Sequence, residues 1–337
     1  MQKVRNRPGD LAVEAIGLVK TFETVRAVDG IDLEVHQGQV LGVLGPNGAG
    51  KTTMLKMLAT LLPIDGGTAR IFGVDVAANP HQVRQLVGVT GQYASVDENL
   101  TATENLLLFA RLQGIPKPKA RSTAATLLEQ FDLTEAASKP ISRFSGGMRR
   151  RLDLAASLIT RPPLIFLDEP TTGLDPRTRG QMWDTIRDLV ANGCTVLLTT
   201  QYLDEADQLA DRIAVIDHGV KVAEGTSDEL KASVGLSTLT LSLVDPGQIP
   251  AAAEIAARLL GEQPTLSPES RRLSLPLERS EQAVDVLVTL RDRGIAVDSV
   301  NVAKPSLDEV FMVLTGHGAT SDDDQPDTAS TELEAVR

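Results

Sequence analysis

The sequence predicts an α/β fold with a mainly parallel sheet, followed by a smaller α+β domain. A glycine-rich loop at residues 45–53 stands between an apolar, strand-like run and a helix-like run. Further apolar runs at residues 164–167, 195–200 and 212–217 are separated by helix-length segments, which is typical of parallel strands joined by crossover helices. From residue 237 on, the pattern of elements changes to β-α-β-β-α-β.

Composition limits the classes of protein to which the chain can belong. Its 337 residues, 42% of them hydrophobic, are enough for one large domain and a smaller one. The formal net charge of -12 argues against a general nucleic-acid-binding surface. The single cysteine, Cys194, excludes an internal disulfide, and the histidines show no metal-ligand spacing. No apolar run approaches the ~20 residues that span a bilayer, so we expect a cytoplasmic or peripheral protein.

The elements before residue 165 are predicted in chain order. Residues 12–22 and 28–35 read as strands that precede the glycine loop. Between residues 100 and 161 the apolar residues follow helical spacing with no convincing strand, and a Gly-Pro break at 114–118 separates two helices. We therefore expect a helical subdomain over about 96–162, inserted in a core domain that covers residues 1–235.

The glycine loop has the pattern of a phosphate cradle, because glycines let successive backbone N–H groups turn toward phosphate oxygens. Lys51 is placed to reach the β- and γ-phosphates, the Thr52 hydroxyl to hold Mg²⁺, and the following helix to add its positive dipole end. The chain should therefore bind a nucleoside triphosphate. The predicted phosphate-binding residues are Gly45, Pro46, Asn47, Gly48, Ala49, Gly50, Lys51, Thr52 and Thr53.

Two adjacent carboxylates, Asp168 and Glu169, end the apolar run at 164–167. In an open α/β sheet, ligands bind at the carboxyl ends of the strands. Asp168 is therefore predicted to hold Mg²⁺, and Glu169 to polarise an attacking water.

The second domain, residues 236–316, is predicted as a ferredoxin-like plait with an added helix. Ser306 and Glu309 form a Ser-x-x-Glu capping box that places the start of that last helix. Residues 317–337 are acidic and lack periodic apolar residues, so we expect a disordered tail. The predicted elements are strands at 239–243, 264–267, 273–277 and 295–302, and helices at 249–260, 281–293 and 307–314.

A second glycine turn, Ser145-Gly146-Gly147, precedes another helix-like run. Together with the phosphate loop and the acidic pair, it makes the chain resemble an ATP-binding cassette (ABC) protein over residues 11 to about 229. The family's Leu-Ser-Gly-Gly-Gln signature reads here with Phe144 and Met148 at its two ends. The resemblance implies that Ser145, Gly146 and Gly147 close on the ATP of an opposite subunit.

Other positions follow the order of the family's motifs. The resemblance implies that Gln92 senses Mg²⁺ and the membrane partner, and that Asp175 lies in the loop that crosses the dimer interface. It also implies that Phe22 stacks on adenine, although a core position is an equal alternative for that side chain. Gln201 stands where the family commonly has histidine; glutamine can donate a hydrogen bond to a γ-phosphate but cannot carry positive charge. We expect slow hydrolysis, with Glu169, Gln201 and Lys51 as the catalytic residues.

Gln201, the Phe-Ser-Gly-Gly-Met signature and the helix after Pro305 resemble the daunorubicin/doxorubicin resistance ATP-binding subunit family. This resemblance implies a homodimeric ATPase that uses ATP and Mg²⁺. It also implies a place on the cytoplasmic side of the cell membrane, beside a separate permease that exports hydrophobic drugs or lipids. Two alternatives stay open: a soluble ABC ATPase acting on ribosomes or DNA, and a nucleotide-dependent regulatory module without useful turnover.

Overall fold

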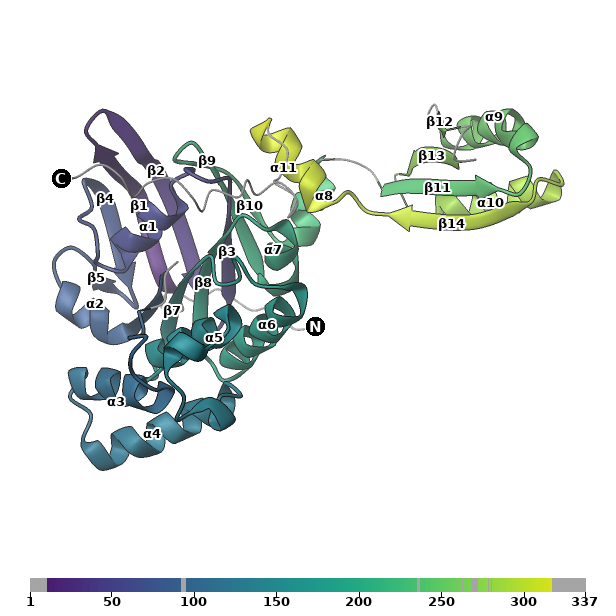
Figure 1. Cartoon of the computed structure of the whole chain (residues 1–337). Helices are drawn as coiled ribbons and strands as arrows, with labels where there is room; N and C mark the ends of the chain where they lie inside the picture. The colour runs from purple at the N-terminus through teal and green to yellow at the C-terminus, as the bar shows by residue number, and fades with distance from the viewer. Residues whose placement is uncertain are drawn as a thin grey trace, which may run out of the picture. The chain divides into compact units, whose positions relative to one another are not determined.

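The computed structural model describes residues 11–91, 95–234, 237–261, 264–267, 272–277, 279 and 281–316 (Figure 1). Gln92 and the expected acidic tail at 317–337 lie outside these residues. By its internal contacts the chain divides between Ser227 and Asp228 into two compact units. Within the described part of the chain, no helix has the length and apolar character needed to cross a membrane.

The first unit is built on a six-stranded sheet with the order β10-β9-β3-β8-β7-β6. Strands β9, β3, β8, β7 and β6 are parallel to their neighbours, and β10 pairs antiparallel with β9 at one edge. The predicted parallel sheet is therefore confirmed, whereas β6 and β10 were not predicted. The strands are β3 (Val40–Leu44), β6 (Val87–Thr90), β7 (Leu164–Asp168), β8 (Thr195–Thr200), β9 (Arg212–Asp217) and β10 (Val220–Gly225).

The two predicted N-terminal strands lie in a separate antiparallel sheet of order β2-β1-β4-β5. They pair with each other along most of their length, from Leu11 opposite His36 to Phe22 opposite Val25. This second sheet was not predicted, because β4 and β5 are short and contain few apolar residues. Its strands are β1 (Leu11–Phe22), β2 (Val25–His36), β4 (Gly66–Ile71) and β5 (Val74–Asp75).

Side chains of the parallel sheet alternate between two hydrophobic cores, as the period of a strand requires. In β7, Leu164 and Phe166 enter a core shared with α1 (Lys51–Leu58) and the antiparallel sheet. The side chains of Ile165 and Leu167 enter the other core, shared with the helical region. The sheet is thus buried on both faces, which holds the carboxyl ends of its strands in fixed positions.

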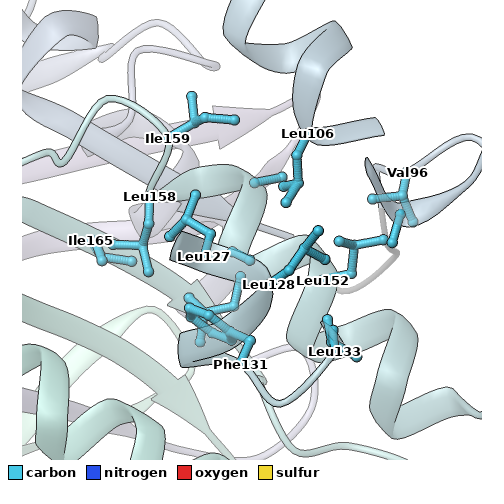
Figure 2. Packing of buried hydrophobic residues seen from close by; sticks show 14 of the residues in the cluster. Val96, Leu106, Leu127, Leu128, Phe131, Leu133, Leu152, Leu158, Ile159 and Ile165 are labelled. Atoms are coloured by element: carbon cyan, nitrogen blue, oxygen red, sulfur yellow. The ribbon is translucent and has the colours of Figure 1, made fainter. Parts of the chain in front are cut away.

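Helices cover the second face of the parallel sheet (Figure 2). Figure 2 shows Leu106 of α3, Leu127 of α4, Phe131 just after α4 and Leu152 of α5 in the same buried cluster as Ile165 of the sheet. The predicted break is confirmed, since α3 ends at Leu112 and α4 begins at Lys117. The remaining helices of this unit are α2 (Pro80–Leu86), α3 (Ala102–Leu112), α4 (Lys117–Gln130), α5 (Gly146–Ser157), α6 (Pro176–Ala191) and α7 (Leu203–Leu209), with short 3₁₀ turns at Thr134–Ala136 and Ile141–Arg143.

The second unit has the predicted β-α-β-β-α-β order, with an antiparallel sheet of order β12-β13-β11-β14. Apolar side chains of β11 and β13 pack on α9 and α10 in a core of their own. The predicted capping box is confirmed at Ser306, whose hydroxyl accepts from the Glu309 N–H at 3.2 Å. The elements are α8 (Ser227–Val234), β11 (Ser237–Leu243), a 3₁₀ turn (Pro246–Gln248), α9 (Ile249–Leu260), β12 (Thr265–Ser267), β13 (Arg272–Leu277), α10 (Gln282–Asp292), β14 (Val297–Ala303) and α11 (Leu307–Thr315).

Candidate nucleotide site

The phosphate loop connects the end of β3 to the start of α1, and two of its glycines are sterically required. A Cβ at Gly45 would lie 2.2 Å from the Ile216 carbonyl oxygen. At Gly50, φ is +101° and a Cβ would lie 2.2 Å from the Ala27 carbonyl oxygen. The loop borders a cavity of about 140 Å³, whose lining residues are Ala27, Asn47, Gly48, Ala49, Gly50, Lys51, Thr52, Thr53 and Glu169.

Lys51 lies buried beneath this loop. Its Nζ donates hydrogen bonds to the carbonyl oxygens of Gly45 at 2.7 Å and Pro46 at 3.0 Å, and lies 3.6 Å from Oε1 of Glu169. Burial lowers the pKa of Lys51, and the Glu169 carboxylate opposes that shift. An ammonium held by loop carbonyls beside the cavity is placed to receive a phosphate group.

Asp168 and Thr52 meet although they are distant in the sequence. The Thr52 hydroxyl donates to Oδ1 of Asp168 at 2.9 Å, and Asp168 is 3% exposed. These oxygens fit Mg²⁺, which prefers hard oxygen ligands and takes few from the protein when phosphates supply the others. The described residues contain no cluster of three or more His, Cys, Asp or Glu side chains that could hold a metal ion. Water and phosphate oxygens can supply further ligands to a Mg²⁺ held by Thr52 and Asp168.

Glu169 follows directly after β7 and adopts a left-handed backbone with φ +48°. Its N–H donates to the Thr199 carbonyl oxygen at 3.1 Å, and its Oε2 accepts from the Thr172 hydroxyl at 3.4 Å. The carboxylate borders the phosphate cavity and is 7% exposed. The structure therefore brings Lys51, Thr52 and Glu169 together around one cavity, and Asp168 joins them through its hydrogen bond with Thr52.

Gln201 is the residue that follows β8. Thr200 pairs in register with Leu44 of β3, and the Gly45 N–H donates to the Thr200 carbonyl oxygen at 3.3 Å. Gln201, which is half-buried, is therefore held next to the start of the phosphate loop.

Ser145 and Asp175 occupy helix N-termini. The Ser145 hydroxyl caps α5 by accepting from the Met148 N–H at 3.2 Å. The Asp175 carboxylate caps α6 by accepting from the Thr178 N–H at 3.0 Å. Both caps are exposed, as is Gly146, and Gly147 is buried against Thr178.

Phe22 lies at the end of β1 and is 44% exposed, with Lys20 Nζ 5.6 Å from its ring centroid. An aromatic ring with a free face can stack on a base.

Two residues that were not predicted from the sequence, Thr199 and Arg150, also contact the acidic pair. The Thr199 hydroxyl donates to Oδ1 of Asp168 at 2.6 Å and accepts from the Glu169 N–H at 3.2 Å. The guanidinium of Arg150 donates to the carbonyl oxygens of Asp168 and Glu169, both at 2.9 Å. Arg150 follows the Ser-Gly-Gly turn in a run of three arginines, but nothing in the sequence distinguishes Thr199 from the other residues of β8.

The phosphate loop on a parallel sheet, the acidic pair and the helical region define the class of protein as an ABC ATPase. The sequence profile of ABC transporters matches residues 28–172. An ATP-binding cassette of an ABC transporter, solved in its ADP conformation, superposes with a TM-score of 0.60 at 25% identity over 65% of this chain and 92% of its own. The dimeric post-hydrolysis structure of an ATP-binding cassette bound to ADP and Pi superposes with a TM-score of 0.58 at 25% identity. The match covers 64% of this chain and 98% of that structure.

Full-length relatives identify the particular family. The daunorubicin/doxorubicin resistance ATP-binding protein DrrA of Streptomyces peucetius is 53% identical over 96% of this chain and 98% of its own length. The doxorubicin resistance ATP-binding protein DrrA of Mycobacterium tuberculosis is 43% identical over 92% of this chain and 95% of its own length. Residues 225–315 match the C-terminal domain of ATP-binding proteins like DrrA1-3. The chain belongs to the DrrA family of ABC transporter ATP-binding proteins, and it is an ATP-hydrolysing transporter subunit.

Proposed function

We propose that this chain energises an exporter of hydrophobic drugs, antibiotics or lipids by hydrolysing ATP for a separate membrane permease. The proposed chemistry is supported by the position of Lys51, Thr52 and Glu169 at one cavity, with Asp168 hydrogen-bonded to Thr52. The substrate class is supported by the drug-resistance names of relatives that match nearly the whole chain.

The proposed reaction uses each of these residues in a distinct role. The loop N–H groups and Lys51 hold the phosphates of ATP, and Thr52 and Asp168 would hold Mg²⁺, with Gln92 as a further ligand. The metal supplies positive charge against the phosphate oxygens. The Glu169 carboxylate accepts a proton from the attacking water, and the Gln201 amide donates a hydrogen bond to the γ-phosphate.

We propose that two copies of the chain bind two ATP molecules between them, head to tail. The exposed Ser145 and Gly146 at the start of α5 support this arrangement, because backbone N–H groups at a helix N-terminus can receive a phosphate from a partner. Asp175 at the start of α6 is exposed as well, as a residue at the proposed dimer interface would be. Phe22 would stack on adenine, and Gly146 and Gly147 would approach the partner's ATP.

The same proposal gives the chain a peripheral place on the cytoplasmic side of the cell membrane. The permease would contact the surface beside Gln92, and the acidic net charge of -12 opposes nucleic acid as a partner. Residues 1–235 would form the nucleotide-binding domain and 236–316 an accessory or regulatory domain.

The hydrolysis is tested by comparing phosphate release from the wild-type chain and its Glu169→Gln variant. We expect the variant to lose about 100-fold or more in rate while a fluorescent ATP analogue still binds, because only the base is removed. Wild-type hydrolysis no faster than that of the variant would favour the regulatory-module alternative.

The transport role is tested by a pull-down of the tagged chain from detergent-solubilised native membranes with ATP present. A polytopic membrane protein in stoichiometric amount is the expected partner. Co-expressed with that partner, the wild-type chain should lower cellular accumulation of a fluorescent anthracycline, and Glu169→Gln should not. Ribosomal or DNA-associated partners without a membrane protein would overturn the transporter proposal.

A further inference from the structure

The buried side chain of Arg150 lies directly beneath the turn that carries the catalytic glutamate. Arg150 belongs to α5 and is 8% exposed. Its Nη2 donates to the carbonyl oxygens of Asp168 and Glu169, both at 2.9 Å, and its Nε to that of Pro170 at 3.0 Å. Its Nη1 donates to the carbonyl oxygen of Gly91. One guanidinium therefore binds three consecutive carbonyls of the catalytic turn and the residue before Gln92.

The turn needs such a clamp because Glu169 is in a conformation that side chains seldom adopt. A non-glycine residue with φ +48° persists only where its surroundings hold it there. Arg150 holds the carbonyl side of the turn, and Thr199 holds the Glu169 N–H. Only arginine offers five N–H groups in a planar fork that can reach several acceptors at once.

Arg150 also joins this turn to the helix that starts at the proposed signature. Ser145 caps α5, and Arg150 stands about one helical turn further along the same helix. Displacement of the α5 N-terminus would therefore be carried to the backbone that aims the Glu169 carboxylate.

We propose that Arg150 is a positioning residue that sets the aim of Glu169 in its own subunit and couples it to the signature helix. This inference rests on the proposed function, because it assumes hydrolysis in a head-to-tail pair. Catalysis is sensitive to small displacements of the reacting groups, so loosening this clamp should lower turnover more than nucleotide binding.

The substitution Arg150→Lys tests the clamp while keeping its charge. The carboxylates of Asp153, Asp168, Glu205 and Glu169 surround Arg150, so a neutral variant would leave buried acids uncompensated. Lysine keeps the positive charge but loses the planar fork. The matched control is Arg149→Lys, since Arg149 lies next to it and pairs with Glu98 at 2.9 Å.

The first measurement is steady-state ATPase activity of the full-length chain, together with affinity for a fluorescent ATP analogue and thermal unfolding. We expect Arg150→Lys to lower kcat about 10- to 100-fold with nucleotide affinity within about twofold of wild type. Arg149→Lys should change neither. Equal kcat for the two variants would overturn the proposal. Loss of folding or of nucleotide affinity in Arg150→Lys, in parallel with kcat, would show a structural role and would also overturn it.

Mixed dimers, isolated with two different affinity tags, test whether Arg150 acts within its own subunit. A dimer of Arg150→Lys with Glu169→Gln should be nearly inactive, because the only remaining glutamate lacks its clamp. A dimer of the double variant with wild type should keep about half of wild-type activity, because its remaining Glu169 retains Arg150. If the first dimer were the more active of the two, Arg150 would act on the Glu169 of the partner subunit, which would contradict the proposal.

These outcomes separate this inference from the function on which it rests. Wild-type hydrolysis no faster than that of Glu169→Gln would overturn the proposed function and the role of Arg150 together. Hydrolysis by wild type, with the two lysine variants alike, would overturn the role of Arg150 alone.

Discussion

Thr199 shows at the scale of a single residue how the two proposed functional acids, Asp168 and Glu169, are held. It belongs to β8, the strand between the one that leads into the phosphate loop and the one that ends at Asp168. Its hydroxyl donates to the Asp168 carboxylate at 2.6 Å and accepts from the Glu169 N–H at 3.2 Å. One buried hydroxyl thus orients both acids that follow β7.

Removing this hydroxyl should impair catalysis with little change in packing volume. We predict that Thr199→Val lowers kcat by at least about tenfold and stability by about 1.5–3 kcal/mol, because a hydrogen bond to a charged group is lost. Steady-state ATPase kinetics and urea unfolding measure the two effects. Thr199→Ser, which keeps the hydroxyl, is the control and should stay near wild type; a similar loss in both variants would contradict the argument.

Cys194 offers a second prediction at this scale, on pH dependence. Burial raises the pKa of its thiol from 9.0 to about 11. Because the thiolate is the nucleophile, alkylation by iodoacetamide at pH 7 should be about 100-fold slower than for a free thiol. The rate should rise about tenfold per pH unit up to about pH 11. A plateau near pH 9 in the folded protein would contradict this, and Cys194→Ser supplies the blank.

At the scale of elements, the N-termini of α5 and α6 meet at Gly147 and Thr178. A Cβ at Gly147 would lie 2.2 Å from Cγ2 of Thr178. The Thr178 hydroxyl donates at 2.6 Å to Asp175, which caps α6. The two proposed dimer-facing caps, Ser145 and Asp175, therefore begin helices whose first turns are packed together.

This contact predicts a destabilising substitution and its rescue. Gly147→Ala should lower the free energy of unfolding by about 1–3 kcal/mol, because it overpacks the contact. Adding Thr178→Ser removes Cγ2 and keeps the hydroxyl, so the double variant should recover most of that loss. The free energy of unfolding is measured by urea unfolding followed by Trp183 fluorescence. Trp183 lies in α6 and is the single tryptophan of the chain, so its signal reports on this unit. Additive losses in the double variant would contradict the prediction.

At the scale of the whole molecule, nucleotide binding and the second unit rest on separate cores. The phosphate cavity belongs to the first unit, whose parallel sheet has one core on each face. The second unit has its own core between its antiparallel sheet and α9 and α10. Each unit therefore has the hydrophobic core that independent folding requires.

We predict two thermal transitions, of which nucleotide raises only one. With Mg²⁺ and ATP at about 100 times the dissociation constant, binding should stabilise the first unit by about 2.7 kcal/mol. The Glu169→Gln variant is used so that ATP is not consumed during heating. Calorimetry shows the transitions of both units, and Trp183 fluorescence follows the transition of the first unit alone. Lys51→Ala should abolish the shift. Equal shifts of both transitions would mean that the units do not unfold independently.

The sequence by itself determined the features that depend on short spacings. The phosphate loop, the Asp168-Glu169 pair and the Ser306 capping box each consist of a few consecutive residues. Their conformations depend on local backbone geometry, so the sequence alone predicts them. The β-α-β-β-α-β order was predicted for the same reason, since each of its elements carries its own periodic pattern.

Only the tertiary structure decided which distant residues share a site. Thr52 contacts Asp168, Arg150 contacts the carbonyl oxygens of Asp168 and Glu169, and Gly147 lies against Thr178. These contacts follow from strand order and helix packing, which place residues from separate elements side by side. The antiparallel sheet of β1 and β2 was decided in the same way, because an apolar strand pattern does not specify its pairing partner.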